Sequence, residues 1–242
     1  MIKPLPESDT ANLVVSNHVL YQHKVVDGFG HVSMRDPRTP NLFWMARSVA
    51  PALVRAKDIL PFDLDCNPMV RDAPTVYAER FIHGEIYRRH PGALAVVHSH
   101  AASVIPFGLV KGTPLRALFH MASFLGSHTP IFEIRDHGGD CTDLLIRDSK
   151  LGAALAQTLG DHSVVLMRGH GDVTVGASVR IAVARAYYTE VNARLQAQAL
   201  TLGADVHYLS TEEAVKADAV NITVLDRIWN LWKLRVEQLM AK

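Results

Sequence analysis

Three histidines beside two short apolar strings are the residues of this chain best placed to do chemistry. His98 and His100 follow the apolar run 95–97, and residues two apart on an extended strand point to the same side. His170 lies between two glycines shortly after a second apolar run, 164–167, and glycine lets another segment approach closely. Three imidazole nitrogens with one open position are the donor set of a catalytic metal site. The alternative is three unrelated core or surface histidines.

A carboxylate is expected beside these histidines. Glu79 opens the helix expected over Tyr77–Arg89, which precedes the strand that carries His98. A carboxylate next to a divalent ion either binds it or exchanges protons with the substrate. The alternative is a glutamate that faces water and stabilises the start of a helix. Glu85 and Glu133 are rival candidates that spacing does not exclude.

The elements that must position these groups mix helical and strand patterns along the whole chain. No internal repeat, low-complexity linker or block of like charge interrupts them, so we expect one α/β domain over residues 1–242. The expected strands are His31–Arg35, Leu42–Ala46, Asp58–Leu64, Ala93–His98, Pro130–Ile134, Ser163–Met167 and Asp172–Gly176. The expected helices are 10–24, Tyr77–Arg89, Ser149–Leu159, Ser178–Leu202, Thr211–Val215 and Thr223–Met240, with helical or mixed segments over 103–109 and 115–125.

Composition narrows the function classes. A chain of 242 residues can bury a sizeable core. Its net charge of +1, with both signs interspersed, gives no reason to expect nucleic acid or a membrane surface as a partner. Cys66 and Cys141 lie far apart and lack the spacing of a thiolate zinc site. No apolar leader begins the chain, and no stretch approaches the ~18 apolar residues of a membrane span. These features predict a cytoplasmic protein.

Four motifs, in this order, carry a resemblance to a known family. They are Gly30-His31-Val32-Ser33, the segment Glu79–His83, the segment Ala95–His100, and Gly169-His170-Gly171. Over residues from about 10 to 205 the chain resembles the class II aldolase/adducin family. The resemblance implies a three-layer α/β/α fold around a central, mostly antiparallel sheet. It also implies a homotetramer with active sites between subunits.

The resemblance also implies roles for individual residues. His98, His100 and His170 match the family's metal ligands, and Glu79 matches its acid/base or fourth ligand. His120 falls where the family's aldolases carry a tyrosine that enters the neighbouring active site, and histidine is a suitable acid near neutral pH. One divalent ion per subunit is therefore expected. Zinc suits three imidazoles, manganese suits a site completed by oxygen ligands, and iron serves a few relatives.

Three departures from the sugar-phosphate enzymes of this family point to its decarboxylases. His31 replaces an asparagine, Ala46-Arg47-Ser48 replaces a Thr-Gly turn, and Tyr77-Ala78 replaces a pair of serines. Phosphate needs small hydroxyls and glycine amides at close range, whereas an arginine fork suits a carboxylate. The segments Gly28–Ser33, Ala46–Ser48 and Leu166–Gly171 resemble those of 3-hydroxy-2-methylpyridine-4,5-dicarboxylate decarboxylase and dihydroxyphthalate decarboxylases. We expect His31, Arg47 and Ser48 to bind the substrate.

The expected activity is that of a metal-dependent carbon–carbon lyase. Retro-aldol cleavage and decarboxylation both leave an electron pair that a chelated metal can stabilise. A decarboxylase of a hydroxylated aromatic dicarboxylate is favoured, with a small hydroxy-carboxylate as the binding partner. The alternatives are an aldolase or epimerase acting on a sugar or sugar phosphate, a non-catalytic adducin-like module, and an iron-dependent oxygenase.

Overall fold

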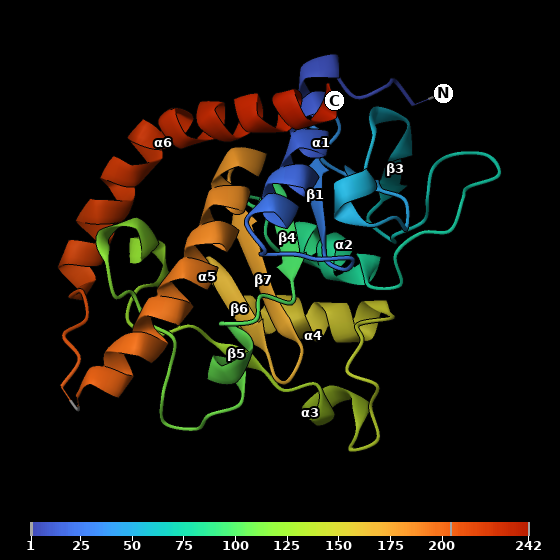
Figure 1. Cartoon of the computed structure of the whole chain (residues 1–242). Coiled ribbons are helices and arrows are strands. Elements are labelled where there is room, and N and C mark those ends of the chain that lie inside the picture. The colour runs from blue at the N-terminus through green and yellow to red at the C-terminus, as the bar shows by residue number, and fades with distance from the viewer. Residues whose placement is uncertain (1, 204, 242) are drawn as a thin grey trace.

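A seven-stranded sheet in the order β3-β2-β1-β4-β7-β6-β5 forms the middle layer of the computed structural model (Figure 1). The structure describes residues 2–203 and 205–241. All neighbouring strands are antiparallel except β5 and β6. The strands are β1 His31–Arg35, β2 Leu42–Ala46, β3 Ile59–Asp63, β4 Ala95–Ser99, β5 Ile131–Phe132, β6 Val164–Met167 and β7 Gly171–Gly176.

Helices cover both faces of this sheet. One layer holds α1, α5 and α6, which contact one another, and the opposite layer holds α2 and α4, which also pack together. This arrangement confirms the expected three-layer α/β/α fold with a mostly antiparallel sheet. The α-helices are α1 Glu7–Gln22, α2 Arg80–Arg89, α3 Arg135–Gly138, α4 Ser149–Leu159, α5 Val179–Leu202 and α6 Thr211–Met240. Short 3₁₀ turns are η1 Pro51–Leu53, η2 Ala56–Asp58, η3 Ile105–Gly108 and η4 His120–Leu125.

Side-chain alternation along β4 decides which layer the candidate site faces. Ala95 and Val97 belong to the apolar cluster shared with α1 and α5, whereas Val96 belongs to the cluster shared with α2 and α4. Because side chains alternate along a strand, His98 points with Val96 toward α2. The strand is buried on both faces, which explains why its sequence is a continuous apolar run.

The sequence predicts two separate helices near the C-terminus, Thr211–Val215 and Thr223–Met240, and the break between them is wrong. A single helix, α6, covers Thr211–Met240. Residues 216–222 contain neither glycine nor proline, so nothing in them ends a helix. Contacts to other elements also stabilise residues 216–222 as part of α6. Asp218 lies 3.3 Å from the Arg185 guanidinium, and the Asn221 side chain donates to the His120 carbonyl at 2.7 Å.

The segment before His120 is extended rather than helical. Two fully buried amide side chains of α5 bind its backbone. Asn192 pairs with the backbone of Arg116 and Leu118, and Gln196 pairs with that of Pro114 and Arg116, all at 2.7–3.0 Å. These contacts fix the path of the chain into η4, where His120 begins the turn.

Within the described residues, no helix combines the length and the apolar character that crossing a membrane requires.

Candidate metal centre

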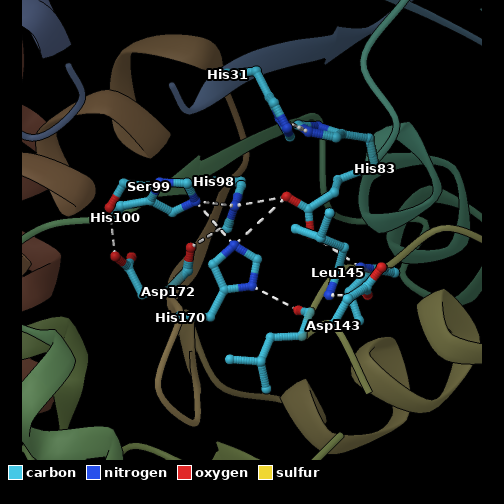
Figure 2. Close-up of polar contacts among 12 residues, drawn as sticks. His31, His83, His98, Ser99, His100, Asp143, Leu145, His170 and Asp172 are labelled. Carbon is cyan, nitrogen blue, oxygen red and sulfur yellow. Dashed lines mark hydrogen bonds and ion pairs between the residues drawn. The ribbon is translucent and has the colours of Figure 1, made fainter. Parts of the chain in front are cut away.

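Four side chains from three segments converge on one point at the α2 side of the sheet. His98 comes from β4, His100 from just beyond its end, His170 from the turn before β7, and Glu79 from the N-cap of α2. Each offers one ligand atom, and these atoms all lie within 4.8 Å of one another. Figure 2 shows the three imidazoles turned toward a common centre. The expected His98–His100–His170 set and Glu79 are therefore together in space.

Backbone carbonyls orient two of the three imidazoles. Nδ1 of His98 donates to the Asp172 carbonyl at 3.0 Å, and Nδ1 of His170 donates to the Leu144 carbonyl at 2.8 Å (Figure 2). A ring that carries its proton on Nδ1 presents a bare lone pair on Nε2. The Nε2 atoms of both residues face the centre. A metal-binding histidine usually binds the ion through one ring nitrogen and donates the N–H of the other to a carbonyl or carboxylate.

The spacing of the donor atoms fits one metal ion. Nε2 of His100 lies 3.1 Å from Nε2 of His98 and 2.9 Å from that of His170. Oε2 of Glu79 lies 3.5 Å from Nε2 of His98 and 3.6 Å from Nε2 of His170. Donors about 2.0–2.1 Å from a shared ion are roughly 2.8–3.0 Å apart in octahedral geometry and roughly 3.3–3.4 Å apart in tetrahedral geometry. Three imidazoles and a carboxylate suit zinc or manganese.

The charge environment also favours a cation. Burial opposes the charge of Glu79, but contact with the positively charged form of His98 outweighs it and lowers the pKa of this carboxyl to about 2. The same contact raises the pKa of His98 despite its burial, so a positive charge is favoured between the two groups. Burial, together with the neighbouring His98 and His170, lowers the pKa of His100 to about 4. Near neutral pH the centre thus holds an ionised carboxylate and an unprotonated His100. Oε1 of Glu79 is fixed by the Ile146 amide at 3.0 Å, which leaves Oε2 for the centre.

Close contact between β4 and β7 brings the two histidine-bearing segments together. A Cβ atom on Gly171 would lie 1.9 Å from the Ser99 carbonyl oxygen, so only glycine fits there. Next to it, the buried Asp172 carboxyl accepts from the Ser99 hydroxyl at 2.5 Å and from the Thr174 hydroxyl at 3.1 Å. Burial raises the pKa of Asp172 to about 6. This junction fixes the strand from which His98 projects.

The substitution Gly171→Ala should lower the free energy of unfolding by roughly 2 kcal/mol or more, because the added methyl group forces the strands apart. Gly28→Ala is the matched control, since a Cβ at Gly28 meets nothing within 4 Å. That control should stay within about 0.5 kcal/mol of the wild type. Urea denaturation of both variants checks this, and equal midpoints would contradict the steric argument.

The residues expected to bind the substrate lie on the β1–β2 side of the centre. His31 is buried, and its ring centroid is 5.0 Å from that of His98. Arg47 follows β2 at the level of His31, and its Nε donates to the Asp58 carboxylate at 2.7 Å. The side chain of Arg47 remains 38% exposed. Ser48 is exposed, and its amide is bonded to the Thr75 carbonyl.

Three other candidates lie outside the cluster of ligand atoms. His120 is exposed at the start of η4 and is not among the four converging residues. Glu85 lies 3.4 Å from the Arg88 guanidinium. Glu133 pairs with Arg135 and Arg168 at 2.8 and 2.6 Å. The two rival carboxylates therefore have cation partners elsewhere, and Glu79 is the carboxylate at the centre.

The sequence does not predict a role for two residues of this region, His83 and Asp172. His83 lies one helical turn beyond Glu79 and contacts Nδ1 of His31 at 2.7 Å. Its i+4 spacing from Glu79 was the available signal, because such residues share a helix face. Asp172 supports His98 through its backbone carbonyl, which no sequence pattern specifies.

Comparison with known proteins identifies the family of this chain and relatives of known reaction class. The family model of the class II aldolase and adducin N-terminal domain matches residues 11–197. The decarboxylase tropJ of Talaromyces stipitatus is 37% identical, and the alignment covers 96% of this chain and 96% of that protein. A 3,4-dihydroxyphthalate decarboxylase of Arthrobacter keyseri is 29% identical and aligns with 79% of this chain and 78% of its own length.

The fold is found among solved structures as well. An aldolase II superfamily protein of Pseudomonas syringae superposes with a TM-score of 0.79 at 20% identity, covering 98% of this chain and 95% of that one. The sheet order, the helix layers and the family match lead to one conclusion. The chain belongs to the class II aldolase and adducin family, and within that family it is similar to decarboxylases.

Proposed function

We propose that this protein is a divalent-metal-dependent decarboxylase of a hydroxylated aromatic dicarboxylate, on a benzene or pyridine ring. The observation that carries the proposal is the convergence of His98, His100, His170 and Glu79 within 4.8 Å. The decarboxylases among its relatives support the reaction class. The residues beside the centre support the substrate class, since His31 and Arg47 offer nitrogen donors to carboxylate and phenolic oxygens.

The metal ion would stabilise negative charge on the substrate, and side chains of the protein would orient the substrate and supply the proton. An ion held by the three histidines and Glu79 would stabilise negative charge on adjacent hydroxyl and carboxylate oxygens of the substrate. An acid protonates the ring carbon that bears the carboxylate, while the ionised hydroxyl oxygen supplies an electron pair to the ring. The bond between that ring carbon and the carboxyl carbon then breaks, carbon dioxide leaves, and the bonding pair restores the aromatic ring. His31 donates a hydrogen bond to an oxygen of the substrate. We assign the protonation of the ring carbon to His120.

Arg47 is assigned to the second carboxylate of the substrate. Its Nε is engaged by Asp58, while the partly exposed remainder of the guanidinium is free to form a fork with a carboxylate. Arg47→Ala should raise KM for a dicarboxylate about 10-fold or more and change kcat much less. Steady-state kinetics check this. KM for a monocarboxylate analogue is the control and should not change. An unchanged KM for the dicarboxylate would remove Arg47 from the site.

His120 is assigned to the active site of a neighbouring subunit in a homotetramer. Its exposure on η4, away from the ligands of its own chain, supports this assignment. His120→Asn should keep its metal and lose about 10²-fold in kcat, the usual contribution of a general acid. Mixing inactive His120→Asn subunits with inactive His98→Ala subunits should restore part of the activity. Mixed tetramers that remain inactive would contradict a site shared between subunits.

The substrate class is tested by release of carbon dioxide. The protein is loaded with Mn²⁺ or Zn²⁺ and offered 3,4-dihydroxyphthalate and related hydroxylated benzene and pyridine dicarboxylates. We expect stoichiometric release from at least one of them, and negligible cleavage of L-fuculose 1-phosphate or L-ribulose 5-phosphate. Efficient cleavage of a sugar phosphate would overturn the proposal in favour of an aldolase. Oxygen consumption during turnover would favour an iron-dependent oxygenase.

The proposal also covers the domain organisation and the cellular compartment. We treat residues 1–242 as one domain, because strands from both halves of the chain share one sheet. The balanced composition and the two unpaired cysteines, Cys66 and Cys141, support a cytoplasmic enzyme.

A further inference from the structure

Behind the metal centre, a strand and a helix each present a row of polar side chains to the other. Residues two apart on a strand share a face, and so do residues four apart on a helix. The row on β1 consists of His31, Ser33 and Arg35, and the row that begins at the N-cap of α2 consists of Glu79, His83 and Tyr87. Glu79, the first residue of the second row, belongs to the metal centre, so the two rows lead from that centre into the core.

Four of these residues form an unbroken chain of hydrogen bonds, here named the polar ladder: His31, His83, Ser33 and Tyr87. Nδ1 of His31 lies 2.7 Å from Nε2 of His83. Nδ1 of His83 lies 2.6 Å from the Ser33 hydroxyl, which lies 2.7 Å from the Tyr87 hydroxyl. Every member is at most 4% exposed. Figure 2 shows His31 and His83 side by side at the edge of the histidine cluster.

The far end of the polar ladder sets the direction of its hydrogen bonds. Within the described part of the chain, Ser33 Oγ is the one acceptor within reach of the Tyr87 hydroxyl. Buried hydroxyl hydrogens are almost always bonded. Tyr87 therefore donates to Ser33, Ser33 donates to Nδ1 of His83, and Nε2–H of His83 donates to Nδ1 of His31. The reverse direction would leave the hydrogen of the enclosed Tyr87 hydroxyl without an acceptor, whereas this direction places the unpaired donor on Nε2 of His31, which is not among the fully buried unpaired atoms of the described residues.

This direction fixes the proton on His31. Its Nδ1 accepts from His83, so a neutral His31 carries its hydrogen on Nε2. Packing fixes the ring as well, because its centroid lies 4.7 Å from Tyr77, 4.8 Å from His83 and 5.0 Å from His98. No described residue forms a hydrogen bond with Nε2 of His31, so this donor is left for a ligand.

We propose that the polar ladder is a positioning device which holds His31 in its Nε2–H form, as a fixed donor to an anionic oxygen of the substrate at the metal centre. His83, Ser33 and Tyr87 are positioning residues, since they act through His31. The inference rests on the proposed function for the identity of the ligand, a carboxylate or phenolate. The form and orientation of His31 follow from the polar ladder alone.

The first test measures the proton positions directly. Nitrogen-15 NMR of the Zn²⁺-loaded protein, labelled in its histidine rings, distinguishes the two neutral forms of each imidazole. Spectra of His31→Gln and His83→Gln assign the two signals. We expect both rings to carry hydrogen on Nε2 and to be bare at Nδ1. The ligands His98 and His170 should show the opposite pattern. A His31 ring with its hydrogen on Nδ1, or a mixture of the two tautomers, would overturn the proposal.

The second test compares two replacements of His83. In His83→Gln the side-chain amide can donate to His31 and accept from Ser33, whereas in His83→Met it can do neither. We expect kcat/KM for carbon dioxide release to fall about 10- to 100-fold in His83→Met, the usual cost of losing a supporting residue. His83→Gln should recover most of this loss. Metal content and melting temperature confirm that both variants are folded and loaded.

A double-mutant cycle separates positioning from a general structural role. If His83 acts through His31, His83→Met should cost nothing further in a His31→Ala background. A loss of the same size in both backgrounds would contradict the proposal. Failure of the wild type to decarboxylate any substrate would overturn the proposed function, whereas the NMR measurement would still decide the form of His31.

Discussion

Replacing His98, His100 or His170 with alanine should abolish metal binding and carbon dioxide release while leaving the chain folded. Each substitution removes one of the four converging ligands, of which Nε2 of His100 lies 3.1 and 2.9 Å from those of His98 and His170, and no other described side chain is among them to replace the lost bond. Loss of a supporting residue behind a ligand typically costs 10- to 100-fold. We therefore expect the loss of a ligand itself to exceed ~100-fold in activity. Elemental analysis after dialysis gives the metal content.

His128→Ala is the matched control for these substitutions. His128 is an exposed histidine outside the converging group, so its replacement should leave metal content and activity unchanged. Thermal denaturation of the metal-free proteins shows whether the three ligand variants remain folded. Full metal occupancy in all three would contradict the assigned ligand set.

Glu79→Gln should weaken metal binding and also slow turnover at saturating metal. The amide retains the shape of the carboxylate and can accept the bond from the Ile146 amide, but it lacks the negative charge beside His98 and His170. We expect metal affinity to fall about 10- to 100-fold. At saturating metal, kcat should remain about 10²-fold low, because an amide cannot accept the proton that the substrate hydroxyl loses when it ionises. Metal titration and steady-state kinetics separate the two effects.

The rival carboxylate Glu133 provides the control for Glu79. Glu133 pairs with Arg135 and Arg168, outside the cluster of ligand atoms, so Glu133→Gln should leave metal affinity and kcat unchanged. Wild-type turnover by Glu79→Gln at saturating metal would limit Glu79 to a ligand role. A normal metal affinity in the same variant would remove it from the ligands.

The features of the fold and of the metal centre that the sequence predicts depend on local periodicity. The hairpin of β1 and β2 has the predicted bounds, and α4 also begins and ends where the pattern places it. The shared face of His98 and His100 follows from alternation along a strand. The three layers and the mostly antiparallel sheet are confirmed by the structure, but their prediction depends on resemblance to a family rather than on any local pattern, and the strand order is not predicted at all.

The parts that could not be predicted depend on contacts between distant segments. The middle of α6 is supported by Arg185 on α5 and by the backbone of His120, and neither contact is visible as periodicity. The same holds for the polar ladder. His83 and Ser33 are 50 residues apart in sequence, and only the packing of α2 on the sheet makes them partners. Spacing shows that residues share a face, whereas topology decides what that face meets.

The central claim is that one divalent ion held by His98, His100, His170 and Glu79 is required for release of carbon dioxide from a hydroxylated aromatic dicarboxylate. The most direct test titrates chelator-treated, metal-free protein with Mn²⁺ or Zn²⁺ while carbon dioxide release is followed. Activity should be absent at the start and should saturate at one ion per chain. An undiminished rate in the metal-free protein would contradict the claim.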